Sequence, residues 1–278
     1  DGLAGLILNK GLQEEMGTMG KYDVAAYVWP AYTGRDKRSL MFWPEGMGEW
    51  QSVKNSVKKF PGHSWPRKPL WGYVDEADPY VMEMEIEAAV DHGVNVFIYD
   101  WYWFDGRPYL ENCLNEGFLQ AKNRDKMKFY LMWANHDVNY TWDIRLSWEQ
   151  DTTGGVDREE FERICRRIIH KYFVQPNYYQ IDGEPVFQIY ELGILIDGLG
   201  GLENTRDALN WFREETIKAG FKGLHLQLTA HGGVPNLSGL DKEGAKAGGD
   251  IGTFLGFSSV THYQFVHITD IDRDYEDI

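Results

Sequence analysis

Short apolar runs alternate with amphipathic segments along most of this chain, and that alternation predicts its secondary structure. Six runs have the length and the β-branched and aromatic content of strands, and they are apolar enough to be covered on both faces. They cover residues 23–29, 94–99, 128–133, 185–190, 224–228 and 254–261. Strands of this kind, separated by helices, are typical of a parallel sheet.

Helix signals stand between these runs. Asp78 and Pro79 supply an N-cap and a first helical position, and the segment that follows them ends at Gly93. Asp157 and Glu160 form a capping box ahead of apolar residues at helical spacing. Two further helices are predicted over residues 110–121 and 203–219.

Repeated strand–helix units fit either an open, doubly wound sheet or a closed barrel of eight strands. The open sheet usually carries a phosphate-binding glycine loop after a strand, and neither G-x-G-x-x-G nor G-x-x-x-x-G-K-[ST] follows any of these strands. The sequence therefore predicts an α/β fold of the (β/α)8 TIM-barrel type, with about six βα units in this chain. We expect residues 1–21 to form an N-terminal extension and residues 22–278 to form a partial barrel domain. Residues 31–77, far longer than a usual connection of about 2–6 residues, are a candidate functional loop.

Composition narrows the classes of partner. The 278 residues include 28 Lys and Arg against 43 Asp and Glu, a net charge of −15 at pH 7. Without a basic stripe this charge repels polyanions, so nucleic acid is not an expected partner. No apolar run is long enough to cross a membrane. Aromatic residues make up 15% of the chain, and Trp and Tyr are the side chains that stack on sugar or base faces. Cys113 and Cys165 lie in predicted helices and are expected to be buried thiols.

In a parallel barrel the residues directly after each strand meet at one end and build the active site. Here these residues are acidic, aromatic or imidazole-bearing after every predicted strand. In strand order they are Trp29; Asp100, Trp101 and Tyr102; Trp133, Asn135, His136 and Asp137; Glu191; His231; and His262 and Tyr263. Acid/base groups beside stacking platforms are what a sugar-binding site needs, so we expect all of them to contact a glycan substrate, with sugar rings on Trp101 and Trp133.

Several of these candidates also have a structural interpretation. Asp100 fits a cap for the loop before the next helix. Trp101 and Trp103 fit the core, although two Trp separated by one residue in a loop cannot both face one interior side. His136 and Asp137 fit a structural pair.

Glu191 ends an otherwise apolar strand, where a buried carboxylate would need a partner, and it is the candidate catalytic residue. His231 and His262 lack the H-E-x-x-H or H-x-H spacing of metal ligands. We predict no metal and no cofactor.

Three motifs resemble those of WbsX-type domains, which are similar to glycoside hydrolase family 99. They are W-G-Y-V-D-E-A-D-P at 71–79, F-I-Y-D-W-Y-W at 97–103 and K-F-Y-L-M-W-A-N-H-D at 128–137, and further matching segments lie at 181–191 and 255–263. The resemblance extends over residues 22–278. It implies a (β/α)8 barrel, retaining endo-mannosidase or mannanase chemistry with participation of the sugar 2-hydroxyl, and first sugar contacts from Asp100, Trp101, Trp133, Asn135, His136, Asp137 and Glu191.

One feature of these families is missing. Their catalytic acids lie in an N-E-W-x-E-G segment after the final strand, and this sequence has no such segment. We therefore expect these residues to be a portion of a longer chain, or a degenerate member completed by something else. By themselves they are expected to be catalytically silent, because they lack the acid pair.

The sequence thus predicts a carbohydrate-active protein, a retaining glycoside hydrolase of a polysaccharide or oligosaccharide in its full-length form. One alternative is a non-catalytic carbohydrate-binding protein, and a second is a glycosyltransferase of polysaccharide assembly. The second would need a sugar-nucleotide site, and no D-x-D motif follows a strand, although Asp270–Asp272 matches it in the acidic terminal run. The oligomeric state is left open by the sequence. A secreted, periplasmic or cell-surface location is our expectation.

Overall fold

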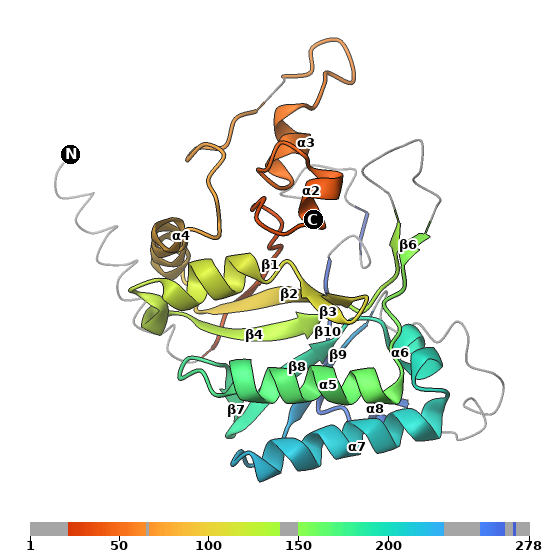
Figure 1. Ribbon diagram of the computed structural model, residues 1–278. Coiled ribbons are helices and arrows are strands. Elements are labelled where there is room, and N and C mark those ends of the chain that lie inside the picture. Colours follow the sequence, from red (N-terminus) through yellow and green to blue (C-terminus); the bar gives the residue numbers. More distant parts are fainter. Residues whose placement is uncertain (1–21, 65–66, 140–149, 231–250, 265–268, 271–278) are drawn as a thin grey trace, which may run out of the picture.

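The computed structural model describes residues 22–64, 67–139, 150–230, 251–264 and 269–270 (Figure 1). Its main feature is a sheet of six parallel strands. In sheet order they are β1 (Ala25–Val28), β2 (Val96–Phe104), β4 (Lys128–Trp133), β8 (Glu184–Ile189), β9 (His225–Thr229) and β10 (Ser259–Thr261). Each strand pairs with the next one in sequence, which is the winding of a barrel, whereas a doubly wound sheet reverses direction at its centre. The predicted fold class and the six βα units are confirmed.

Helices cover one face of this sheet, and Figure 1 shows two of them, α5 and α7, side by side. The helices are α4 (Pro79–Asp91), α5 (Arg158–Ile168), α6 (Leu192–Gly198), α7 (Leu202–Lys218) and α8 (Ile251–Leu255). Both predicted caps are confirmed: the Asp78 carboxylate accepts from the Tyr80 backbone N–H, and the Asp157 carboxylate accepts from that of Glu160. The predicted sixth strand, 254–261, is wrong in its first half, where α8 ends and only β10 is extended.

Shorter elements fill the connections. They are α2 (Ser39–Phe42), α3 (Trp50–Lys54), β3 (Arg107–Tyr109), β5 (Val138–Asn139), β6 (Gln150–Thr152) and β7 (Gln180–Ile181), with π-helical turns at Cys113–Gly117 and Ile169–Phe173 and 3₁₀ turns at Phe118–Gln120 and Arg124–Lys126. The predicted helix over 110–121 is therefore a π-helical turn followed by a 3₁₀ turn. Cys113 and Cys165 are free and buried, as predicted.

The strand β2 is longer than predicted because it turns into a tight hairpin. Asp105 and Gly106, with φ of 50° and 74°, connect it to the antiparallel β3. Positive φ at both central residues is the geometry of the two-residue turn that the Asp-Gly dipeptide favours. Asp100, Trp101 and Tyr102 consequently lie within the strand, and not in a loop after it as predicted.

Side chains along β2 alternate between the two faces of the sheet. Phe97, Tyr99, Trp101 and Trp103 face the helices, whereas Ile98, Asp100, Tyr102 and Phe104 face the inner side. The hydrophobic core lies on the helical side, where Tyr99 packs on Phe118 and Phe187 of β8 packs on Phe212 of α7.

The sheet curls so strongly that its first and last strands meet across the inner face. The Tyr27 hydroxyl of β1 donates to the backbone carbonyl of His262 after β10, at 3.2 Å. Gln188 of β8 donates to the Tyr27 hydroxyl at 3.0 Å and to the Thr229 hydroxyl of β9 at 2.7 Å. Side chains therefore fill the inside of the curl, as in a small barrel. None of the helices in the described ranges is long and apolar enough to span a membrane.

Candidate functional site

Six aromatic side chains form a continuous series of ring contacts at the carboxyl ends of the strands. In order they are Trp29, Tyr102, His136, Tyr190, Tyr263 and Tyr27, with successive ring centroids 5.6, 5.7, 5.7, 5.2 and 4.7 Å apart. We call this set the aromatic arc. Its members come from β1, β2 and the segments after β1, β4, β8 and β10, so that five of the six parallel strands contribute. The predicted convergence at this end of the sheet thus holds for Trp29, Tyr102, His136 and Tyr263.

Asp100 lies against this arc from the inner face of β2. Its side chain is buried, with 2% of the residue exposed, and the Tyr263 hydroxyl donates to Oδ2 at 2.7 Å. The other oxygen, Oδ1, is buried and has no hydrogen-bond partner among the described residues. Burial raises the pKa of Asp100 to about 7, although the hydrogen bond from Tyr263 acts in the opposite direction. Near neutral pH this carboxyl therefore populates both of its protonation states.

The tyrosines around Asp100 stay protonated over the same pH range. Burial and the charges of Glu191 and Asp100 raise the pKa of Tyr190 to about 12. Burial, together with the Asp100 charge, also raises the pKa of Tyr263. Both hydroxyls are consequently hydrogen-bond donors at neutral pH.

Asn135 holds the segment that carries Glu191. Its amide nitrogen donates to the Glu191 carbonyl at 2.7 Å, and its amide oxygen accepts from the Glu191 backbone N–H at 2.8 Å. Asn135 is 1% exposed, so its own amide faces protein and not ligand. Glu191 is half-buried beside Tyr190, whose pKa it raises. Asn135 is therefore a positioning residue, and the Glu191 side chain remains a candidate.

The long connection after β1 adds a third carboxylate to the site, that of Glu49. Trp29 donates its indole N–H to the carboxylate of Glu49, and the Glu49 backbone N–H donates to the carbonyl of Ala31 at 2.9 Å. Sequence reasoning missed Glu49, Tyr27 and Tyr190. The period-two pattern of the strands would have revealed the two tyrosines, because Tyr27 lies next to the last residue of β1 and Tyr190 is two residues after the inward-facing Gln188 of β8.

Trp101 and Trp133 lie on the opposite side of the sheet from the arc. They are 2% and 0% exposed; the Trp101 indole N–H donates to Glu111 at 2.9 Å, and the Trp133 ring packs 6.2 Å from Phe161 of α5. The prediction that sugar rings stack on them is wrong. The physical reason is strand alternation, which turns both indoles toward the helices while Asp100 faces inward.

The remaining candidates lie apart from the arc or outside the described residues. Asp137 is exposed, and its carboxylate holds a local turn by accepting from the Thr153 hydroxyl at 2.9 Å and the Gly154 N–H at 3.0 Å. His262 is exposed, with Nδ1 3.0 Å from the carbonyl of Ala230. His231 lies outside the residues that the structure describes. Within the ranges described, no group of three or more His, Cys, Asp or Glu side chains could hold a metal ion.

Comparisons with known proteins agree with the resemblance found in the sequence. A family model described as "Glycosyltransferase WbsX" matches residues 24–254. Two curated proteins of Xanthomonas campestris pv. campestris, strains B100 and ATCC 33913, both called "Uncharacterized protein WxcX", are 27% identical over 180 residues. These matches cover 63% of this chain and 24% of each relative, so the chain spans about a quarter of their length.

Solved structures of the GH99 endo-alpha-mannosidase from Bacteroides thetaiotaomicron are also similar. One is 13% identical, with a TM-score of 0.38 and coverage of 87% of this chain and 84% of that one. The same enzyme in complex with bis-tris-propane gives a TM-score of 0.37 and covers 87% and 83%, again at 13% identity. The predicted resemblance to WbsX-type domains is confirmed.

Proposed function

The chain belongs to the WbsX glycosyltransferase family, a family of carbohydrate-active proteins, and on that premise we propose that the aromatic arc and Asp100 bind a glycan. We propose further that the protein hydrolyses a glycosidic bond of this glycan, with retention, when the chain is part of its full-length form. The observation that carries both proposals is the arrangement of the arc around a buried carboxyl at the carboxyl ends of the strands.

The chemistry of the arc suits a sugar. Aromatic rings supply apolar surface for the C–H faces of a pyranose. The hydroxyl oxygens of Tyr27 and Tyr263, whose protons are donated to His262 and Asp100, supply acceptors at their edges. A carboxyl beside them hydrogen-bonds strongly to sugar hydroxyls when it is ionised. Asp100 already accepts a hydrogen bond from a hydroxyl group, that of Tyr263, at 2.7 Å.

Hydrolysis needs a proton donor and a carboxylate on opposite sides of the scissile bond. The full-length protein is expected to supply the proton donor, and within this chain we assign to Asp100 the role of holding a sugar hydroxyl, because it is buried against the arc and bonded to Tyr263. We assign the carboxylate role to Glu191, which Asn135 fixes next to Tyr190. A glycosyl transfer by the same groups is the alternative that the family description favours, and a non-catalytic glycan-binding role needs only the arc.

Binding is tested on the 278-residue chain. Mannose-containing oligosaccharides would be titrated calorimetrically into the wild-type protein and into Asp100→Asn and Tyr263→Phe. Each variant should weaken binding by about 1–3 kcal/mol. Asp100→Asn removes the carboxylate that would bond to the ligand, and Tyr263→Phe removes the hydroxyl that bonds to Asp100. Tyr179→Phe is the matched control: the Tyr179 hydroxyl donates to Asp23, ahead of β1 and so at the amino end of the sheet. Equal affinities for wild type, Asp100→Asn and Tyr263→Phe would refute the site.

The reaction is tested on the full-length protein. Release of reducing ends that Asp100→Asn and Glu191→Gln both abolish would support hydrolysis. Consumption of a sugar nucleotide that depends on the same two residues would establish transfer in its place. Tight glycan binding with neither reaction would leave the non-catalytic role.

A further inference from the structure

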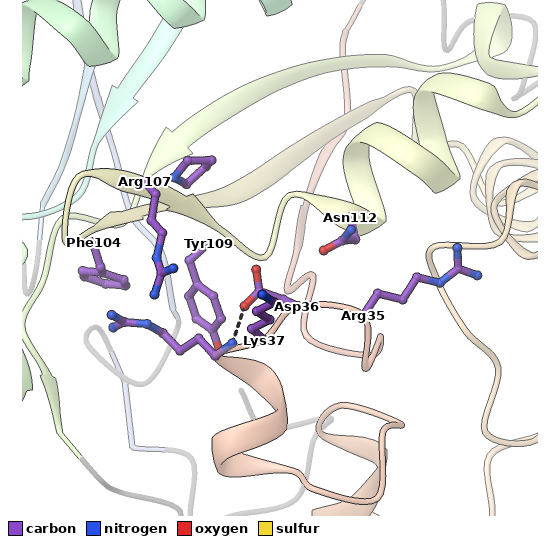
Figure 2. Close-up of a pocket in the computed structure, with 9 residues that line it drawn as sticks. Arg35, Asp36, Lys37, Phe104, Arg107, Tyr109 and Asn112 are labelled. Atoms are coloured by element: carbon purple, nitrogen blue, oxygen red, sulfur yellow. Dashed lines mark hydrogen bonds between the residues drawn. The ribbon is translucent and has the colours of Figure 1, made fainter.

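A separate cavity of about 270 Å³ lies beside the arc, between the β2–β3 hairpin and the segment that leads into α2 (Figure 2). Arg107 and Tyr109, two residues apart on β3, share one face of that strand by its alternation. Figure 2 shows both side chains extending from the hairpin into the cavity, with Tyr109 next to Asp36 and Lys37 and with Arg107 on the side of Phe104. The cavity is therefore walled by two segments that are far apart in the sequence.

Two of the cations that line this cavity are uncompensated. Lys37 and Arg107 are exposed and have no ion pair or hydrogen bond in the described part of the chain. Arg38 is paired with Asp105, and Arg35 is paired with two carboxylates and points away from the cavity in Figure 2. Free positive charge stands out in a chain whose net charge is −15.

The carboxylate that lines the cavity does not cancel this charge. Asp36 accepts the backbone N–H groups of Arg38 at 2.7 Å and Ser39 at 3.4 Å through the same oxygen, Oδ1. It therefore caps the turn into α2, and its single negative charge can balance only one of the two cations.

An unused hydrogen-bond donor completes the cavity wall. Tyr109 is 7% exposed, and its hydroxyl has no hydrogen-bond partner within the described ranges. The hydroxyl lies near Ser39 but outside hydrogen-bonding geometry. A buried hydroxyl without a hydrogen-bond partner costs free energy, and a ligand that accepts a hydrogen bond from it would recover that cost.

The cavity continues the proposed glycan site. Tyr109 contacts Tyr102 of the aromatic arc, with ring centroids 6.1 Å apart. Phe104, which also lines the cavity, follows Tyr102 on the same face of β2, about 7 Å along the strand. One oligosaccharide that lies on the arc can thus place its neighbouring residue in the cavity.

We propose that this cavity binds an anionic group of the glycan, a carboxylate or a phosphate, through Arg107, Lys37 and the Tyr109 hydroxyl. The guanidinium of Arg107 can grip either group with two parallel hydrogen bonds, and Lys37 adds a point charge. The proposal rests on the glycan-binding function above and specifies its substrate class as an acidic glycan.

The test compares acidic ligands with neutral partners of the same length. Tetragalacturonate and its methyl ester form the carboxylate pair, and a phosphorylated mannose oligosaccharide and its dephosphorylated form make up the phosphate pair. Inorganic phosphate is a third probe. All are titrated at fixed ionic strength into wild type, Arg107→Gln and Lys37→Gln. We expect at least one acidic ligand to bind more tightly than its neutral partner, and each variant to weaken that ligand about 10-fold or more without changing the neutral one.

The control is Lys222→Gln, which removes an exposed cation that packs on Gly183 at the amino end of β8. It should leave every affinity unchanged. Equal affinity for acidic and neutral partners, or acidic binding that Arg107→Gln and Lys37→Gln do not weaken, overturns the anion site. The proposed function fails separately: if inorganic phosphate binds through Arg107 while no oligosaccharide binds at all, the anion site stands and the glycan site does not.

Discussion

The unfolding free energy of Asp100→Asn should rise relative to that of wild type as the pH rises, although the substitution removes a residue of the proposed active site. Burial raises the pKa of Asp100 from 3.8 to about 7 in the folded protein. The folded state therefore holds this proton more tightly than the unfolded state. The stabilisation that results is complete below pH 3.8 and is lost as the pH rises through about 7.

The magnitude follows from the two pKa values. Relative to acid pH, the raised pKa of Asp100 lowers the unfolding free energy by about 1.7 kcal/mol at pH 5, where only the unfolded state is ionised, and by about 4 kcal/mol at pH 8, a difference on the order of 2–3 kcal/mol. Asparagine does not titrate, so its unfolding free energy lacks this slope. Any constant effect of the buried amide cancels when the two pH values are compared.

The assay is urea unfolding of wild type and Asp100→Asn at pH 5, 6, 7 and 8. The unfolding free energy of the variant minus that of wild type should rise by about 2–3 kcal/mol across the series. Tyr263→Phe is the companion variant, because its hydroxyl donates the bond that lowers the pKa of Asp100. Without that bond the pKa of Asp100 should be higher still, so Tyr263→Phe should lose the stabilisation of protonated Asp100 at a higher pH than wild type does. A difference between Asp100→Asn and wild type that stays constant from pH 5 to pH 8 would refute the account of Asp100 as a buried carboxyl.

Four further outcomes are expected. Asn135→Ala should lower the unfolding free energy measured in urea by about 2–4 kcal/mol, because it leaves the backbone N–H and C=O of Glu191 without their partner. A loss below about 0.5 kcal/mol would contradict the role of Asn135 in holding this segment. Glu111→Ala should cost about 3–5 kcal/mol by stranding Arg167, which lies 2.6 Å from the Glu111 carboxylate. Burial acts to raise the pKa of Glu111, but Arg167 and its other partners hold it below the usual value, so this stabilisation should fade in acid unfolding below about pH 4.5. Trp133→Phe should lower the thermal midpoint yet leave glycan affinity within about twofold, since the indole packs on the helical side; a large loss of affinity would restore it to the site. Treatment with EDTA should change neither the thermal midpoint nor glycan binding, and recovery of a lost property by one particular metal would disprove this.

Local chemistry made much of the fold predictable. Asp78 and Asp157 each cap a helix through a side chain that bonds to a residue two or three positions on, and such signals lie entirely within a few residues. The six apolar runs were likewise predictable because parallel strands are covered on both faces. Phe254 and Leu255, the last residues of α8, are wrongly predicted as part of a strand, since a short apolar run has the same composition in either element.

The site was less predictable because its contacts are distant in sequence. Asp100 interrupts an apolar run, so the pattern predicts the end of a strand there; its place inside β2 comes from pairing with β4, and its hydrogen-bond partner Tyr263 lies 163 positions later. Trp101 was grouped with Asp100 as its neighbour, although neighbours in a strand face opposite ways. The Asp-Gly turn at 105–106 was a local signal that was overlooked, and it would have extended β2 to Phe104.

The contact between Asp100 and Tyr263 also sets when the site can form during synthesis. The ribosome adds about 5–20 residues per second, so Tyr263 emerges roughly 8–30 s after Asp100, which it follows by 163 positions. The hydrogen bond from Tyr27 to His262 spans 235 positions, so the delay between synthesis of its two partners is longer than for Asp100 and Tyr263. Until Tyr263 has been made, Asp100 lacks the partner that bonds to it in the folded protein, so synthesis from the N-terminus cannot complete this contact while the early strands are emerging.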